Sequence, residues 1–364
     1  MNKREVLFGT GALALIGVGA SGFEARRMGS MADYNASAAA TRRALAANPQ
    51  MRDLVRFATL APNGHNTQPW RFQIRERQIA ILPDFARRTP IVDPDDHHIF
   101  VSLGAAAENL TLACAARGRS GETSFSAAGD GAVMFTFGGK TGPEPALFDA
   151  IVHRQSTRAE YDGRAVLAAD LQILAKTAET PGVDLVLITD RPQIDRVRDL
   201  VLAGNSAQLA DPAFVRELQA WIRFSPRQAM RSGDGLFAAA SGNPSLPDWL
   251  GQGLFARVLK PDTDNAKYAR QIRSSAGLAV FASERDDKEH WVHVGRACQR
   301  FALQATALGM KHAFINQPIE VVRLRSELAS LIGLPGRRPD IVMRFGYGPA
   351  LPFSVRRPVE AVLA

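Results

Sequence analysis

Cysteine is scarce in this chain of 364 residues, and several catalytic motifs are missing altogether. The two cysteines, Cys114 and Cys298, exclude a disulfide framework. No CxxC or HExxH motif is present, so no metal site is expected. The lack of a GxSxG elbow and of a P-loop argues against the hydrolase and nucleotide chemistry that these motifs support.

Charge of one sign is not concentrated in any part of the chain. The net charge of +8 arises from 44 basic and 36 acidic residues, which are interleaved. This pattern excludes the continuous basic stripe of a nucleic-acid-binding protein. What is present is the composition of an ordinary globular protein, with 46% hydrophobic and 22% charged residues. The length predicts about two domains.

The N-terminal residues 1–30 differ from the rest of the chain. An uncharged, mostly apolar run from Val6 to Ala20 follows the basic residues Lys3 and Arg4. It is shorter than the roughly 20 residues of a membrane span and is typical of a secretory signal. Residues 2–7 resemble a twin-arginine export signal with lysine in the first arginine position. We therefore expect a periplasmic or membrane-associated protein. An uncleaved membrane anchor is the alternative, and without a working signal the protein is cytoplasmic.

Apolar periodicity predicts both helices and strands in the remaining chain. Helices are expected over residues 37–60, 96–118, 146–153, 167–178, 193–204 and 287–309, and strands over 70–74, 78–82, 132–137, 183–188, 277–282 and 341–346. Residues 225–262 are rich in glycine, proline and serine and are expected to form a long loop or lid. Because strands and helices mix without strict alternation, we expect a layered α+β fold with a mixed sheet.

Two of the predicted helices resemble each other. Residues 96–118 and 287–309 align without gaps, and Gly104 coincides with Gly295. One interpretation is a duplicated unit, in which these two glycines allow the helices to approach closely. The other is that two buried, alanine-rich helices share only their composition.

A polar loop joins the first predicted helix to the first predicted strand. It contains Asn63, Gly64, His65, Asn66 and Gln68. Amide side chains can both donate and accept hydrogen bonds, as the pyrimidine edge of a flavin requires, and glycine lets the backbone approach a flat ring. The alternative is a polar turn that caps neighbouring elements.

A second candidate site consists of Arg154, Ser156 and Arg158. In extended backbone these alternate residues point the same way, so that two guanidinium groups and a hydroxyl converge as in a phosphate clamp. Arg356 and Arg357, after the last predicted strand, supply further positive charge. The alternatives are a solvated charge run and a solvated basic tail.

Together these motifs resemble the FMN-dependent nitroreductase family. That family combines an Arg-x-Ser-x-Arg clamp, a loop ending in Asn-x-Gln-Pro-Trp, and a C-terminal Gly-Tyr strand followed by arginine. Here Asn63 replaces the usual serine, and the loop precedes the clamp instead of following it. This order, the repeat and the length resemble the Acg-type branch, in which two nitroreductase-like halves are fused. Asn316 and Gln317 belong to a partial second copy of the loop motif.

The resemblance implies a three-layer α/β/α fold with a mixed, mainly antiparallel sheet. It divides the chain into a first half, residues 31–145, and a second half, residues 146–364, with a lid-like insert at about 221–262. It further implies one FMN per chain, held in a monomeric pseudo-dimer or a homodimer. Membrane attachment would run through residues 1–30.

The implied function is that of an oxidoreductase. Two electrons pass through flavin N5 to a nitroaromatic, a quinone or a similar electrophile, so the partners are a small-molecule electron donor and acceptor. No catalytic side chain is required. The alternative is a flavin-binding or flavin-sequestering protein with a lid-closed site and little turnover. The expected cofactor-binding residues are Asn63, Gly64, His65, Asn66, Gln68, Arg154, Ser156, Arg158, Asn316, Gln317, Arg356 and Arg357.

Overall fold

The computed structural model describes residues 27–140 and 142–364. The predicted signal and its twin-arginine-like motif lie almost entirely in residues 1–26, outside the described residues. The described part begins with α2 (Met31–Thr41), which packs on the segment that follows α8. There the rings of Tyr34 and Phe237 lie 4.4 Å apart.

The first sheet is built from consecutive strands. They are β1 (Trp70–Ile74), β2 (Gln78–Pro83), β3 (Gly121–Ser126) and β4 (Ala132–Phe137). Their order is β1-β2-β4-β3 and every pairing is antiparallel. The long helix α4 (His97–Ala115) connects β2 to β3 and packs on the sheet.

The second sheet repeats this topology. Its strands are β5 (Val183–Ile188), β8 (Gly277–Ser283), β9 (Lys311–Phe314) and β10 (Pro339–Gly346), in the order β5-β8-β10-β9 and again all antiparallel. The helix α12 (Lys288–Ala307) connects β8 to β9, as α4 connects β2 to β3. The shared strand order and helix position support the interpretation of the chain as two repeated halves, whose boundaries remain a prediction.

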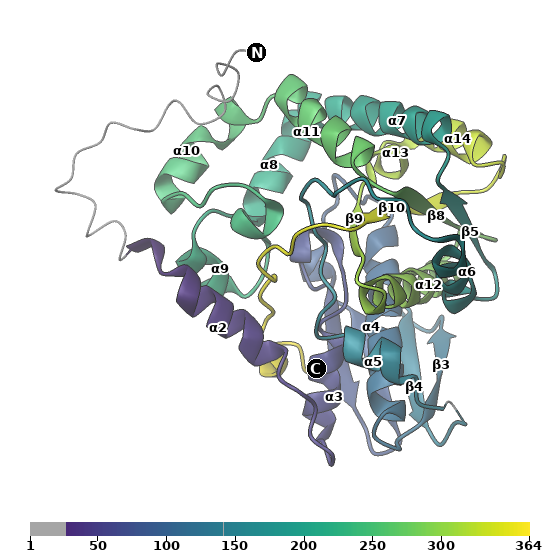
Figure 1. Cartoon of the computed structure of the whole chain (residues 1–364). Helices are drawn as coiled ribbons and strands as arrows, with labels where there is room; N and C mark the ends of the chain where they lie inside the picture. The colour runs from purple at the N-terminus through teal and green to yellow at the C-terminus, as the bar shows by residue number, and fades with distance from the viewer. Residues whose placement is uncertain (1–26, 141) are drawn as a thin grey trace.

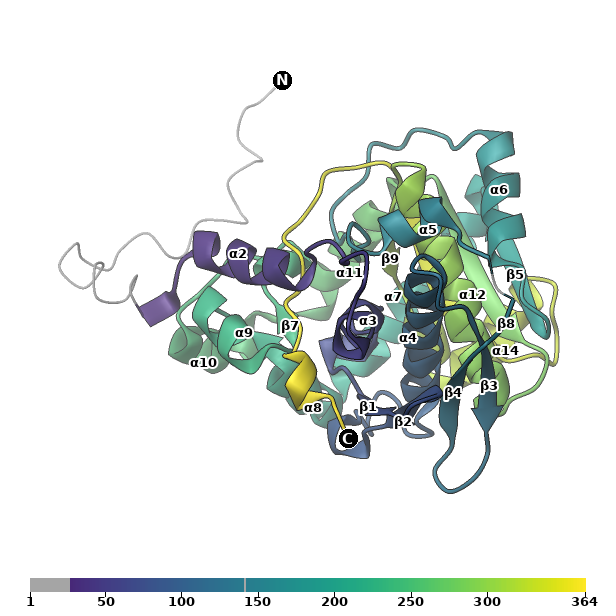
Figure 2. The same cartoon turned by 90° about the horizontal axis from the view of Figure 1, so that it is seen from below.

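The two long helices pack against each other in the centre of the molecule (Figures 1 and 2). Among the described residues, only α4 is long and apolar enough to cross a membrane, and 94% of that stretch is buried in the protein. Its apolar surface is therefore accounted for by packing in the core. The largest hydrophobic cluster joins α4, α12, the first sheet and one face of the second sheet.

The other face of the second sheet is covered by helices, with a hydrophobic cluster between. Figure 1 shows these helices on the side of the sheet opposite α12. They are α7 (Arg191–Ala210), α11 (Pro261–Arg273), α13 (Gln317–Glu320) and α14 (Val322–Leu331). The second sheet thus has the expected α/β/α layering, and the α+β class is confirmed.

The prediction of a long loop over residues 225–262 is wrong, because most of this segment is regular structure. It contains α9 (Pro226–Ser232), β7 (Leu236–Phe237), η3 (Ala239–Ser241) and α10 (Asp248–Val258). Its loop-forming residues act as helix caps: the Ser225 hydroxyl accepts a hydrogen bond from a first-turn N–H, and Gly233 ends α9 in the left-handed conformation.

The segment belongs to a longer insertion. Residues 189–276 separate β5 from β8, whereas only residues 75–77 separate β1 from β2. The insertion also holds α8 (Pro212–Trp221) and the short strand β6 (Ile222–Arg223), which pairs with β7.

The helix predicted over residues 37–60 is interrupted. It is divided into α2 and α3 (Met51–Ala58), and residues 43–50 form no helix. Pro49 lies within this gap, and the residue before a proline avoids helical backbone. The remaining elements are α5 (Pro145–Ala150), α6 (Ala168–Ala178), η1 (Gly64–Asn66), η2 (Phe85–Arg87) and η4 (Val359–Ala361).

Two extended segments add parallel pairings to the sheets. Ser156 forms a bridge with His312 at the edge strand β9. The C-terminal segment, residues 347–364, returns to the first half, where Leu363 forms a bridge with Phe72 of β1. Hydrogen bonds from Arg154 to the Leu60 carbonyl and from Arg356 to the Asn66 side chain place these two segments beside the polar loop that precedes β1.

Candidate functional site

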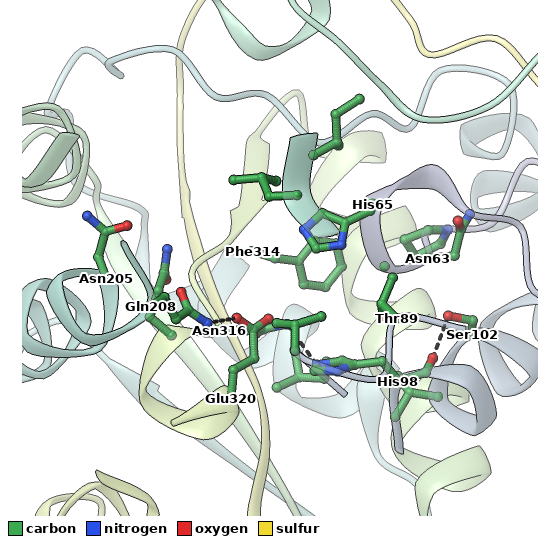
Figure 3. A pocket seen from close by; sticks show the side chains of 18 of the residues that line it. Asn63, His65, Thr89, His98, Ser102, Asn205, Gln208, Phe314, Asn316 and Glu320 are labelled. Carbon is green, nitrogen blue, oxygen red and sulfur yellow. Dashed lines mark hydrogen bonds between the residues drawn. The ribbon is translucent and has the colours of Figure 1, made fainter. Parts of the chain in front are cut away.

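A cavity of about 200 Å³ lies where the two halves meet, next to the crossing of α4 and α12 (Figure 3). The first half contributes residues 62–65 and one face of α4, and the second half contributes α7, α12, α13 and Arg158. Apolar side chains form much of the wall: Val92, Val101, Leu209, Phe214, Leu218, Leu236, Leu259, Phe314 and Ile341.

Half of the twelve predicted cofactor-binding residues line this cavity. They are Asn63, Gly64, His65, Arg158, Asn316 and Gln317. They come from both halves, so the structure brings together motifs that are far apart in the sequence.

The polar loop holds an unusual backbone conformation. His65, Asn66 and Gln68 all have positive φ angles, of 47°, 55° and 54°. The Asn63 side-chain oxygen accepts a hydrogen bond from the Gln68 backbone N–H at 2.8 Å, which fixes the loop. A Cβ at Gly64 would contact only His98, at 4.0 Å, so the backbone is open towards the cavity at this point.

His65 is a neutral residue of the cavity wall. Burial, and then the charge of the nearby Arg158, lower the pKa of His65 to about 4. Its Nδ1 atom is buried without a hydrogen-bond partner among the described residues.

Asn66 and Gln68 do not face the cavity, contrary to the prediction that they bind a flavin edge. The Asn66 amide donates to the Gly235 carbonyl at 3.0 Å and accepts from Arg356 at 2.9 Å. The Gln68 amide donates to the Gly233 carbonyl at 2.8 Å and accepts from the Arg357 N–H at 2.9 Å. These side chains anchor the insertion and the C-terminal segment to the loop.

Arg154 is buried without an acidic partner. It is 3% exposed, and one terminal nitrogen donates to the Leu60 carbonyl at 3.1 Å. Its Nε and its other terminal nitrogen have no partner in the part of the chain that the structure describes. Burial, and then the charge of Arg356, lowers the pKa of Arg154 to about 9. A bound anion would offset both the cost of burying this guanidinium and the repulsion from Arg356.

Arg356 adds charge beside Arg154 but offers no free N–H. Its guanidinium donates to the carbonyls of Thr59, Leu60 and Ala61 and to Asn66. Arg357 lies apart from this pair. Its guanidinium donates to the Ala361 carbonyl at 2.6 Å and lies 3.8 Å from the Asp84 carboxylate. The prediction that Arg357 joins the clamp is therefore wrong, because its side chain is directed towards Asp84.

The rest of the clamp lies along the edge of the second sheet. The Thr157 N–H donates to the His312 carbonyl at 2.8 Å, which holds the backbone of Ser156 and Arg158 extended. The Arg158 guanidinium lines the cavity and has no hydrogen-bond or salt-bridge partner in residues 27–140 and 142–364. His312 is fully buried beside Arg154, and neither of its ring nitrogens has a hydrogen-bond partner among the residues that the structure describes. Burial keeps the pKa of His312 well below the usual value.

Sequence reasoning missed a charged cluster on the cavity wall. His98 lines the cavity, and its Nδ1 lies 3.2 Å from the Asp93 carboxylate. Glu320 also lines the cavity and accepts a hydrogen bond from Gln208 at 2.6 Å. Figure 3 shows His98 and Glu320 on the wall below His65. The only sequence signal was an aspartate five residues before a histidine at the start of a predicted helix.

Asp93, His97 and His98 have ligand-type atoms within 4.8 Å of one another. Hydrogen bonds account for this cluster, because Asp93 binds His98 and the His97 Nε2 atom lies 2.8 Å from Asp340. We therefore assign no metal to it.

Comparison with known proteins identifies relatives of this chain, although no protein-family model matches it. A protein of Mycobacterium tuberculosis named "Putative NAD(P)H nitroreductase" is 26% identical over 324 residues, which cover 86% of this chain and 90% of that protein. A second protein of that organism, "Putative NAD(P)H nitroreductase acg", is 23% identical over 329 residues, covering 86% and 94%.

Two solved structures are also similar to part of the chain. One is the FMN-dependent nitroreductase NfnB from Mycobacterium smegmatis in complex with NADPH, with 13% identity, a TM-score of 0.37, and coverage of 56% of this chain and 87% of that chain. The other is a nitroreductase with bound FMN from Bacteroides fragilis, with 15% identity, a TM-score of 0.35, and coverage of 57% and 90%.

Proposed function

We propose that this chain is an FMN-dependent oxidoreductase that reduces a small electrophile, such as a quinone or a nitroaromatic, by two electrons. Its relatives, which are named as NAD(P)H nitroreductases, align with both halves of the chain. The cavity between the halves supports the same function, since it combines apolar walls with a few polar groups, as small-molecule sites do.

The observation that carries the proposal is the state of Arg154. A buried guanidinium that lacks two hydrogen bonds and any carboxylate is costly for a folded protein. A bound phosphate group would complete its hydrogen bonds and neutralise its charge. Because Arg356 lies beside Arg154, this part of the site suits a dianion.

The residues present therefore fit FMN. Arg154 and Ser156 would hold the phosphate, with Arg356 contributing charge. Asn63, the Gly64 backbone and Arg158 would contact the ring system. When bound, FMN supplies a centre that accepts and donates two electrons, while the protein supplies position, hydrogen bonds and exclusion of water.

The chain's own residues shape this environment. Leu218, Leu236 and Leu259 of the insertion line the cavity with apolar surface. The neutral His65 adds a polar surface without a charge. An electron acceptor would be held against this wall, within reach of the polar residues of α13.

A specific observation also favours the alternative, a flavin-sequestering protein. The insertion is folded over the cavity and is anchored by Asn66 and Gln68, so it does not form a loose flap. A cover of this kind restricts the access of a bulky nicotinamide donor. The two functions differ only in whether a donor can reduce the bound flavin.

The test begins with the absorption spectrum of the purified protein after gel filtration. A flavin spectrum with about one FMN per chain supports the proposal, whereas a colourless protein that does not bind added FMN contradicts it. Anaerobic mixing with NADH and NADPH then separates the two functions. Rapid bleaching identifies a reductase. If only small artificial reductants bleach the flavin, the protein sequesters it.

A further inference from the structure

The ring of His98 is fixed at both nitrogens in the cavity wall. Its Nδ1 lies 3.2 Å from Asp93 Oδ1, and its Nε2 lies 3.4 Å from the side-chain nitrogen of Asn316. The orientation of Asn316 is set independently, because its side-chain oxygen accepts a hydrogen bond from the Val342 N–H at 3.0 Å. The Asn316 nitrogen can only donate, so His98 Nε2 accepts and the proton of the neutral ring lies on Nδ1.

The charges around His98 favour its protonated form. Asp93 faces it from the segment before α4 and Glu320 faces it from α13, while Arg338 opposes them from the segment before β10. Burial is the largest effect and lowers the pKa of His98, but the charge and hydrogen bond of Asp93 together with the charge of Glu320 raise the pKa above its usual value of 6.5. His98 in turn holds the pKa of Asp93 down to about 2 against the effect of burial, so this carboxylate stays ionised.

The other histidines near His98 lack this arrangement. His97 pairs with Asp340 and does not line the cavity. His65 lines the cavity, but its pKa of about 4 keeps it neutral and no carboxylate orients it. His98 therefore combines an orienting carboxylate, an ionisable ring and a position on the cavity wall.

We propose that His98 is the proton donor of this cavity and that Asp93 is its positioning residue. The inference rests on the proposed function and names the class of acceptor: a molecule whose oxygen must be protonated when it is reduced, such as a quinone. In that reaction the acceptor gains two electrons and one proton as hydride. The second proton leaves His98 Nε2 as the new O–H bond forms.

The neutral ring then returns to the tautomer inferred above from its two hydrogen-bond partners. His98 Nε2 accepts its hydrogen bond from Asn316 again, while Asp93 keeps the proton on Nδ1. Water supplies the proton for the next cycle. Glu320, whose pKa is raised by burial, offers a carboxyl group on the same wall for relaying that proton.

The chain provides a matched control. His290 pairs with Asp287 in the same manner at the start of α12, with 2.7 Å between Nδ1 and the carboxylate, but it does not line the cavity. If these histidine–aspartate pairs only capped helices, substitution of His98 and of His290 would have the same effect on the reaction. Proton donation should be confined to His98.

The experiment measures reoxidation of the reduced holoenzyme by benzoquinone and by ferricyanide, which takes up electrons without a proton, from about pH 5 to pH 9. The quinone rate should fall as the pH rises through the pKa of His98. His98→Asn should lower the ratio of quinone rate to ferricyanide rate by about 100-fold at low pH and remove the pH dependence. His290→Asn should keep the wild-type profile. A wild-type ratio and profile in His98→Asn overturns the proposal.

A second readout does not depend on turnover. Nitrogen NMR of the histidine-labelled protein should show His98 Nδ1 protonated throughout and Nε2 titrating above pH 6.5, and Asp93→Asn should lower that pKa. Titration of Nδ1 instead overturns the proposal even if His98→Asn fails to fold. A protein that binds no FMN contradicts the proposed function, whereas an FMN-loaded protein with an unchanged quinone profile in His98→Asn contradicts only the role of His98.

Discussion

Gly104 of α4 and Gly295 of α12 meet the opposite helix in the same way. A Cβ on Gly104 would lie 2.0 Å from the Val292 carbonyl oxygen, and a Cβ on Gly295 would lie 2.0 Å from the Val101 carbonyl oxygen. In the gapless alignment of the two helices, Gly104 coincides with Gly295 and Val101 with Val292. The contact is thus reciprocal, as in the isologous interface of a symmetric dimer.

Substitution of either glycine should destabilise the protein. Gly104→Ala and Gly295→Ala each force the helix backbones apart, and overpacking of this kind costs about 1–3 kcal/mol or more. Gly253→Ala is the matched control, because a Cβ there meets nothing within 4 Å and alanine favours a helix over glycine by about 1 kcal/mol. Thermal unfolding measures both effects. Equal melting temperatures for all three variants would contradict the close approach.

Removal of Arg154 should weaken flavin binding. Arg154→Ala takes away the unpaired donors of the phosphate site, and hydrogen bonds to charged groups contribute about 1.5–3 kcal/mol, so the FMN dissociation constant should rise at least 10-fold. Fluorescence titration of the flavin-free protein measures this change. Arg196→Ala, which alters an exposed residue of α7, should bind FMN as the wild type does. Unchanged binding in Arg154→Ala would remove Arg154 from the phosphate site.

Gln68 should hold the insertion over the cavity. Gln68→Ala leaves the Gly233 carbonyl and the Arg357 N–H without their buried partner, which costs about 1–3 kcal/mol. We expect limited proteolysis within residues 225–262 to become faster, whereas Gln252→Ala, on the exposed side of α10, leaves the rate unchanged. Cleavage at the wild-type rate in Gln68→Ala would show that the insertion is held by other contacts.

Acid stability should depend on Asp93. Its pKa is lowered from 3.8 in the unfolded chain to about 2 in the folded chain. Its contribution is therefore present above pH 4 and is lost as the pH falls through about 2. A difference of this size corresponds to roughly 2 kcal/mol. The unfolding free energy of Asp93→Asn, measured by urea titration, should fall less steeply over this range than that of the wild type, and parallel slopes would contradict the pairing.

The pairing with His98 adds an effect of opposite sign. The folded pKa of His98 is raised, so its contribution is complete below pH 6.5 and is lost as the pH rises through the folded pKa. Wild-type stability should therefore decline between neutral and weakly alkaline pH, and His98→Asn should remove this decline. A wild-type slope in that variant would show that another group titrates.

Much of the fold could be predicted from periodicity. The strand over residues 132–137 and the helix over 168–178 lie where alternation and helical spacing placed them, and the glycine repeat predicted the close helix contact. The insertion could not be predicted in this way. In residues 225–262 the glycine, proline and serine residues cap short helices, and composition alone does not separate a capped helix from a loop.

The candidate site was predicted only in part. Arg158 and Asn63 line the cavity as expected, but Asn66 and Gln68 bind backbone groups of segments more than 160 residues away. Amide side chains satisfy backbone and ligand equally well, so their type does not reveal which one they bind. His98 was missed because its role depends on Asn316 and Glu320, which join it only after folding.

The C-terminal segment makes the order of synthesis important. Leu363 pairs with β1, and Arg356 holds the carbonyls of residues 59–61, so a segment that follows both sheets along the chain completes both the edge of the first sheet and the anion site beside Arg154. The first half thus emerges from the ribosome long before its last partner. Until that partner arrives, the carbonyls of residues 59–61 and the edge strand β1 lack these hydrogen bonds. The anion site is therefore one of the last parts of the molecule to be completed as the chain is synthesised.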